Sequence, residues 1–139
     1  MRPGLYVLQS YVRAEGIRRA WEEWYLQERL YYYSSTLPSV DVSSGRLVRA
    51  RLPIDEAVIY VLEAEELYKK NTKPYENECR LYKDCLKVLN SKERQVFNAV
   101  VWGDPCDLPR EYKKNLFDKA ISKLCDYIEK NHLTKEQAS

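Results

Sequence analysis

Residues 89–103 of this 139-residue chain read L-N-S-K-E-R-Q-V-F-N-A-V-V-W-G. Asn90, followed three positions later by Glu93, is a variant of the capping box and predicts that a helix begins here. Apolar residues then recur at helical spacing, so one face of this helix is expected to point into a core. Gly103 predicts the end of the helix, and Asp104 with Pro105 prevents its continuation. The inward face comprises Val96, Phe97, Val100 and Val101.

Four other segments show helical periodicity, and with the helix just described they predict an all-α fold, a small bundle of about five helices. Residues 5–33 contain no proline and predict a long first helix, loosened at Gly16. The remaining helices are expected to start at Pro53, to span residues 75–89, and to start near Pro109.

Two of these helices have a clear apolar face. Pro53 is expected in the first turn of its helix, where Asp55 and Glu56 complement the helix dipole. The apolar face of that helix comprises Ile54, Val58, Val61, Leu62 and Tyr68. Asp107 is a candidate cap for the last helix, in which apolar residues recur at every fourth position. That stripe comprises Tyr112, Leu116, Ala120, Leu124 and Ile128, and it is widened by Ile121 and Cys125.

The stretch 34–53 interrupts the helical pattern with two prolines, Gly45 and several serines. It predicts either a loop or a short hairpin that pairs two valines with Leu47 and Val48. Near its end, three arginines stand at almost alternate positions, which suits contact with a phosphate backbone. The valines are Val40 and Val42, and the arginines are Arg46, Arg49 and Arg51.

The sequence predicts an N-terminal part over residues 1–52, a helical core over residues 53–133 and a tail over residues 134–139. Residues 1–51 contain eight arginines, no lysine and six of the twelve tyrosines. Arginine beside Tyr and Trp suits stacking on unpaired bases, contact with a protein partner, or a helix with one core face and one solvated face. These alternatives stay open, and the candidate partner-binding residues are Arg18, Arg19, Tyr25 and Arg29.

The composition argues against several classes of protein. The net charge is only +2, from 23 basic and 21 acidic residues, unlike that of histone-like proteins. No apolar run approaches the roughly 20 residues that a membrane span needs. The first residues lack the apolar stretch of a secretory signal. We therefore expect a soluble intracellular protein.

The cysteine and histidine content argues against a metal centre and against hydrolytic catalysis. Structural zinc sites usually draw on closely spaced cysteine or histidine pairs, and no C-x2-C pair occurs in the chain. His132 is the only histidine, and no glycine-rich phosphate loop is present. We expect a non-enzymatic protein without metal or cofactor, whose cysteines are reduced core thiols. These are Cys79, Cys85, Cys106 and Cys125.

The segment quoted first resembles the opening of region 4 of bacterial sigma factors, where a leucine and a polar cap precede an acid–arginine pair, an apolar stripe and a glycine. The sequence K-A-I-S-K-L at residues 119–124 is similar to the end of the recognition helix of that region. The layout of a long first helix, a variable Ser/Gly loop and a connecting helix resembles the ArpU-type regulators of phages of Gram-positive bacteria. The chain departs from the sigma-like pattern because only sixteen residues separate Gly103 from Ala120, too few for a complete extra helix.

The resemblance implies a phage-encoded regulator of late or lytic transcription that binds promoter DNA in the bacterial cytoplasm through a shortened helix-turn-helix. Lysine and arginine would neutralise phosphates, and Asn115 would pair with adenine edges in the major groove. The residues that the resemblance places against duplex DNA are Arg110, Lys113, Lys114, Asn115, Asp118 and Lys119.

Two alternatives belong to other functional classes. One is a phage inhibitor of the anti-CRISPR or RNA-polymerase-binding type, which docks on a host ribonucleoprotein or protein machine. Its surface would be the Arg/Tyr-rich N-terminal part, where Arg18, Arg19 and the three loop arginines would also recruit RNA. The other is a structural helical adaptor that binds no nucleic acid. In each case, an exposed aromatic-rich first helix would offer a seam for a homodimer.

Overall fold

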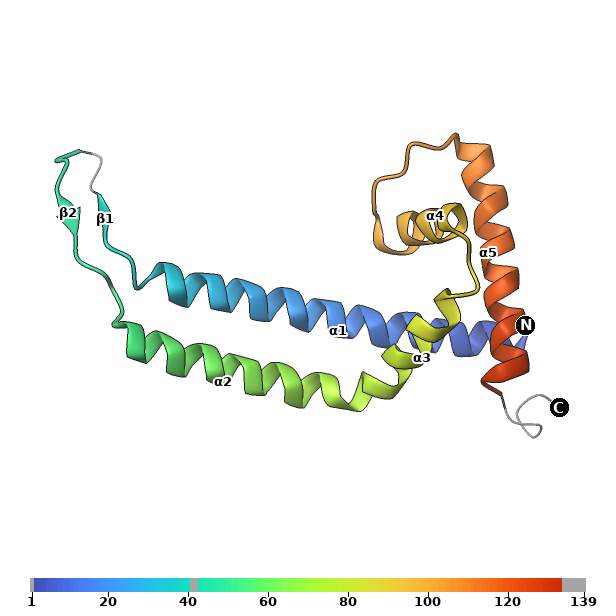
Figure 1. Ribbon diagram of the computed structural model, residues 1–139, viewed down its shortest axis with the longest axis horizontal. Helices are drawn as coiled ribbons and strands as arrows, with labels where there is room; N and C mark the ends of the chain where they lie inside the picture. Colours follow the sequence, from blue (N-terminus) through green and yellow to red (C-terminus); the bar gives the residue numbers. More distant parts are fainter. Residues whose placement is uncertain (1, 41–42, 134–139) are drawn as a thin grey trace. The chain divides into compact units, whose positions relative to one another are not determined.

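The computed structural model describes residues 2–40 and 43–133, and these form an all-α protein, as predicted (Figure 1). A short 3₁₀ helix, η1, joins the second and third α-helices, and two short strands pair between the first and second. The elements are α1 (Pro3–Ser34), β1 (Ser39–Val40), β2 (Leu47–Val48), α2 (Ile54–Thr72), η1 (Lys73–Tyr75), α3 (Glu76–Leu86), α4 (Ser91–Trp102) and α5 (Arg110–Asn131).

The chain divides into two compact units. The core unit comprises residues 1–15 and 77–139, and the helix-pair unit comprises residues 16–76. The boundary predicted after residue 52 therefore falls within the helix-pair unit, ahead of α2. The predicted tail, residues 134–139, lies outside the described residues.

The start and end of α4 follow the sequence prediction closely. The Asn90 side chain accepts the Glu93 backbone N–H at 2.9 Å, and the Glu93 carboxylate accepts the Asn90 N–H at 3.0 Å. Gly103 ends the helix in the left-handed region with φ of 75°, where a side chain would be strained. Val96 and Phe97 are fully buried, but Val100 is 54% exposed, so its predicted inward position is wrong.

The hydrophobic core of the core unit is built from α1, α3, α4 and α5 and from Leu89 in the connection between α3 and α4. Phe97 contacts both Tyr82 and Phe117 through its ring. The Trp102 indole N–H donates to the Tyr82 hydroxyl at 3.0 Å, which provides a partner for two polar atoms among apolar neighbours. The buried cluster comprises Leu8, Tyr11, Tyr82, Cys85, Leu89, Phe97, Ala120, Leu124, Cys125 and Ile128.

The apolar stripe predicted for α5 is buried only along its second half. Ala120, Leu124 and Ile128 are fully buried, whereas Tyr112 is 42% exposed and Leu116 is half-buried. The connection over residues 103–109 contains no helix, so it supplies no apolar face to cover the first turns of α5. The N-cap of α5 is Pro109, and no side chain caps the helix there, so the predicted role of Asp107 is wrong.

In the helix-pair unit, α2 lies alongside the part of α1 that belongs to this unit (Figure 1), and aromatic stacking joins the two helices. The Tyr25 ring stacks on Tyr68 with centroids 5.7 Å apart, and the Tyr32 ring stacks on Tyr60 at 5.2 Å. The residue number of the partner on α2 falls as the residue number of the tyrosine on α1 rises, so the two helices run antiparallel. Gly16 does not interrupt α1, which is continuous from residue 3 to residue 34.

The buried face of α2 differs from the predicted one. Three of the predicted residues are exposed, at 70% for Ile54, 41% for Val58 and 53% for Leu62. Val61 is buried as predicted, and the other two buried residues of this helix, Ala57 and Ala64, were not part of the predicted face. A prediction based on large apolar residues gives little weight to alanine, although its small side chain permits close approach of a neighbouring helix. Pro53 is the N-cap of α2 rather than a first-turn residue.

The hairpin alternative for residues 34–53 is correct, and so is the pairing of Val40 with Leu47, but Val48 pairs with Ser39 rather than with a valine. β1 and β2 are antiparallel, with Val40 opposite Leu47 and Ser39 opposite Val48. Gly45 adopts φ of 69° within the connecting turn. Val42, the other valine of the predicted hairpin, lies outside the described residues.

Gly4 marks a close approach between α1 and α5. A Cβ atom at Gly4 would lie 2.7 Å from the carbonyl oxygen of Cys125 and 2.7 Å from Oε2 of Glu129. Gly4→Ala is therefore expected to lower the free energy of unfolding by about 1–3 kcal/mol, measured by urea denaturation. Gln9→Ala, an exposed position on the same helix, is the control. An unchanged urea midpoint for Gly4→Ala would show that the two helices do not pack this closely.

Candidate nucleic-acid interface

Helix α5 has an exposed first half and an anchored second half. None of residues 110–119 is buried, and this segment makes up about three turns of the helix. The second half contributes four fully buried side chains to the core. In this continuous 22-residue helix, the second half is therefore packed in the core, and the first turns extend beyond the packed part. The buried residues are Ala120, Leu124, Cys125 and Ile128.

Glu93 forms the first anchor of α5. Its side chain is 2% exposed, and Oε1 accepts both the backbone N–H of Asn90 at 3.0 Å and the Lys123 ammonium at 2.7 Å. These two hydrogen bonds, the one from Lys123 above all, lower the pKa of Glu93 below its ordinary value. One ionised carboxylate therefore caps α4 and holds the second half of α5.

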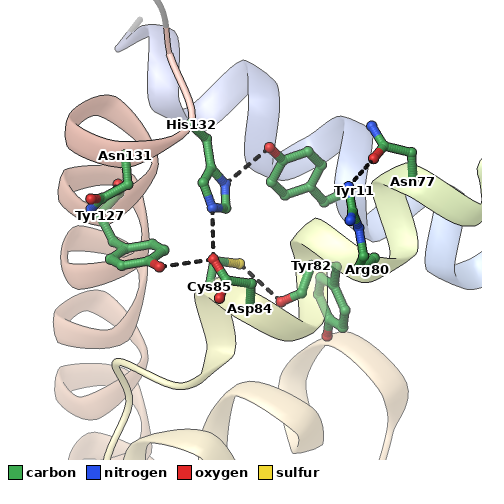
Figure 2. Close-up of polar contacts among 9 residues, drawn as sticks. All are labelled: Tyr11, Asn77, Arg80, Tyr82, Asp84, Cys85, Tyr127, Asn131 and His132. Carbon is green, nitrogen blue, oxygen red and sulfur yellow. Dashed lines mark hydrogen bonds and ion pairs between the residues drawn. The ribbon is translucent and has the colours of Figure 1, made fainter.

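His132, directly after α5, forms the second anchor (Figure 2). Its Nε2 lies 3.0 Å from Oδ2 of Asp84 on α3, and its Nδ1 lies 3.0 Å from the Tyr11 hydroxyl on α1. The Tyr127 hydroxyl donates to the same oxygen of Asp84 at 2.8 Å. These contacts join α1, α3 and the end of α5 through side chains that are far apart in the sequence.

The charge state of Asp84 fixes the hydrogen-bond directions in this cluster. Hydrogen bonds from His132 and then Tyr127 lower the pKa of Asp84, so its carboxylate acts only as an acceptor. Nε2 of His132 therefore carries a proton, and in the neutral ring Nδ1 accepts from Tyr11. Burial raises the pKa of Tyr11 to about 12, so its hydroxyl keeps its proton at neutral pH. Both ring nitrogens of His132 are engaged in hydrogen bonds within the protein, to Asp84 and Tyr11.

Arg2 forms the third anchor, between the start of α1 and the end of α5. Its guanidinium contacts both carboxylate oxygens of Glu129, at 3.0 and 3.1 Å, and also pairs with Asp126. The hydrogen bond from Arg2 lowers the pKa of Glu129. The backbone N–H of Gly4 donates to Glu129 at 3.2 Å. The three anchors together tie α5 to α1, α3 and α4.

The exposed half of α5 carries four cations without an ion-pair partner in the described part of the chain, although one of them, Lys119, also helps to lower the pKa of Glu93 through its charge. No ion pair joins them to a carboxylate within residues 2–40 and 43–133. Four cations and two acids give residues 110–119 a net charge of +2. Asn115, also exposed, provides an amide donor and acceptor in the same segment. The cations are Arg110, Lys113, Lys114 and Lys119, and the acids are Glu111 and Asp118.

The other predicted site residues lie in the helix-pair unit. Arg18 pairs with Glu22 at 2.7 Å, and the Arg29 guanidinium lies 5.8 Å from the centre of the Tyr33 ring. Tyr25 is half-buried in its stack on α2, while Arg19 is exposed. The loop residues Arg46, Arg49 and Arg51 are all exposed. The predicted nucleic-acid-binding residues are therefore divided between two units.

Sequence reasoning did not find the Asp84–His132–Tyr11 cluster. The residues that form it are 48 and 121 positions apart, and none belongs to a local motif. The only signal was that the chain has a single histidine, placed just after the last predicted helix. That position suits a residue that closes the end of a helix against its neighbours.

Comparison of the chain with protein-family models, with curated proteins and with solved structures gives no match. Among the described residues, no helix has the length and apolar character needed to cross a bilayer. Within the same residues, no three His, Cys, Asp or Glu side chains are grouped as metal ligands. None of the four cysteines forms a disulfide within the described residues; three are buried and Cys106 is half-buried.

The anchors predict how stability depends on pH. The folded-state pKa of Glu93 lies below its ordinary value of 4.5. The stabilisation is therefore complete above about pH 4.5 and is lost as the pH falls through the folded-state pKa. Glu93→Gln is expected to lower the free energy of unfolding at pH 7 by about 1–2 kcal/mol and to lose less stability than the natural protein on acidification. Urea denaturation at neutral and acid pH measures both effects.

Glu63→Gln, at an exposed position in the middle of α2, is the control for this experiment. It is expected to leave both the neutral-pH stability and the acid loss unchanged. An acid loss of the same size in Glu93→Gln and in the natural protein would contradict the role of Glu93 as an ionised anchor.

Proposed function

We propose that this protein is a non-enzymatic regulator of phage transcription that binds duplex DNA through residues 110–119 of α5. The observation that supports this most is the state of that segment: three turns of a rigid helix, none of them buried, with cations that are unpaired among the described residues. Phosphate groups are the partners that such cations suit best. The resemblance of residues 89–103 to region 4 of sigma factors also implies that the last helix faces promoter DNA.

The anchors of α5 would hold the DNA-binding segment in position before DNA binds. A helix already fixed at one end loses little conformational entropy when its free end enters a groove. In this account Lys114 and Lys119 contact phosphates on either side of the groove, and Asn115 contacts adenine edges. Glu111 and Asp118 limit the number of phosphates that the segment approaches. DNA binding would take place in the cytoplasm of the bacterial host.

Docking on a host machine through the N-terminal arginines has less support. Arg18 is already paired with Glu22, and Tyr25 is already stacked on Tyr68. A partner would have to replace these interactions before it formed new ones. The exposed loop arginines remain available as an additional contact to phosphate.

The proposal is tested with the full chain and a short fluorescent duplex of mixed sequence, by anisotropy at several salt concentrations. The logarithm of affinity is expected to fall linearly with the logarithm of salt concentration. Lys114→Glu combined with Lys119→Glu is expected to weaken binding and to reduce the magnitude of the salt slope by about 2, one unit for each phosphate that the variant no longer neutralises.

Lys130→Glu, with half the charge change of the double variant, is the control, because Lys130 is exposed on the same helix but lies about 24 Å further along its axis than Lys114. It is expected to bind like the natural protein. If Lys130→Glu weakened DNA binding as much as the double variant does, net charge alone would explain the loss of affinity, and residues 110–119 would not be the interface. Binding abolished only in Arg18→Glu with Arg19→Glu would move the function to the N-terminal surface and overturn the proposal.

A further inference from the structure

A groove with a volume of about 580 Å³ lies in the core unit, between α1, α4 and α5. Leu8 and Phe97, which are fully buried, lie at its base, and Val12, Val101 and Ile121 line it as half-buried side chains. Small-molecule sites in proteins are mostly apolar concavities of about 300–1,000 Å³ with a small number of polar groups. The size and lining of this groove therefore suit a small ligand with an apolar body.

Two opposite charges lie at the edge of the groove. Arg13 on α1 and Asp118 on α5 both line it, and both are exposed. Among the described residues, neither side chain forms an ion pair with the other or with any other group. Gln9, also exposed, adds an amide donor and acceptor to the same edge. The groove therefore combines an apolar interior with one guanidinium and one carboxylate that the core unit does not pair.

This pair of charges restricts the kind of ligand that fits. An apolar carboxylic acid would pair with Arg13 but would place its own charge near Asp118, and an apolar amine would be attracted and repelled in the reverse sense. An uncharged apolar molecule would desolvate both charged groups without giving either a partner. A molecule with a carboxylate, an ammonium group and an apolar body satisfies both charges and fills the groove.

A free α-amino acid with a large apolar side chain has this composition. Its carboxylate and its ammonium group are attached to the same carbon atom as the side chain. The guanidinium of Arg13 can pair with the carboxylate through two parallel hydrogen bonds, and the carboxylate of Asp118 can accept from the ammonium group. A peptide fits less well, because the chain separates its two charged ends.

We infer that this groove binds a free α-amino acid with a large apolar side chain. The ligand carboxylate pairs with Arg13, its ammonium group pairs with Asp118, and its side chain lies between Val12, Val101 and Ile121. The inference concerns the core unit alone and does not depend on DNA binding.

Methyl NMR of the full chain tests the inference by titration with L-phenylalanine, L-tryptophan and L-leucine, each up to about 10 mM. A dissociation constant of about 1 mM is expected for the tightest of the three, because the ligand is small and the groove is open to solvent. The largest shift changes are expected on the methyl groups of Val12, Val101 and Ile121. Glycine, which has no apolar side chain, is expected not to bind. Absence of shift changes with all three apolar amino acids would overturn the inference.

Two derivatives of L-phenylalanine test the need for both ligand charges. N-acetyl-L-phenylalanine keeps the carboxylate but has no ammonium group, and L-phenylalaninamide keeps the ammonium group but has no carboxylate. Each is expected to bind at least about 3-fold more weakly than L-phenylalanine, because it leaves one charge of the groove without a partner. Equal affinity of either derivative would show that the ligand is not an amino acid.

Variants of the two charged residues test the same pairs from the side of the protein. Arg13→Gln and Asp118→Asn are each expected to raise the dissociation constant for L-phenylalanine about 3- to 10-fold. Arg49→Gln and Asp107→Asn are the matched controls, because they make the same changes at exposed positions outside the groove. Both controls are expected to bind like the natural protein. An unchanged dissociation constant in both groove variants would contradict the proposed pairing.

Val101→Trp tests the place of binding, because the larger side chain fills the groove and leaves both charges present. It is expected to abolish the shift changes, and circular dichroism measures whether the helical content is retained. Val12→Trp fills the groove from α1 and replaces Val101→Trp if that variant does not fold. Undiminished binding to a folded variant with a filled groove would show that the ligand binds elsewhere.

Discussion

The Glu93 carboxylate is the group on which the placement of α5 depends. It completes the capping box of α4 and, through the same oxygen, holds Lys123 in the second half of α5. A helix is stiff over three turns, so fixing its second half also fixes the direction of its first half. The first ten residues of α5 can therefore keep their helical structure although none of them is fully buried. The surface proposed to bind nucleic acid is a consequence of anchors that lie outside it.

The three anchors of α5 are formed by polar side chains, and the carboxylate in each of them has its hydrogen-bond partners. Glu93, Asp84 and Glu129 each accept more than one hydrogen bond, and each has a lowered pKa. No buried side-chain nitrogen or oxygen within the described residues lacks a hydrogen-bond partner. Polar groups in this state help to specify one arrangement of helices, because a shifted helix would leave a buried or partly buried charge without its partner. Hydrophobic contacts such as those around Phe97 tolerate small shifts more easily.

Local signals in the sequence were sufficient for the start and end of α4, but not for every position on the buried faces of α2, α4 and α5. The capping box and Gly103 act within one helix, so residues 89–103 determine that helix on their own. Whether Leu116 or Ile54 is buried depends on which other element covers it, and helical spacing carries no information about that. The Asp84–His132 contact spans 48 residues and has no local pattern. The sequence predicted the candidate interface as a set of cations on the last helix. It did not predict that the first half of this helix is exposed while the second half is anchored.

The most direct test of this account is an amide NMR titration of the full chain with duplex DNA at moderate salt. The account predicts that the largest chemical-shift changes fall on residues 110–119, and that residues 120–131 and α4 change little because they form the fixed base. Changes confined to residues 18–29 or 46–51, or no changes at all, would contradict the claim that the exposed half of α5 is the nucleic-acid interface.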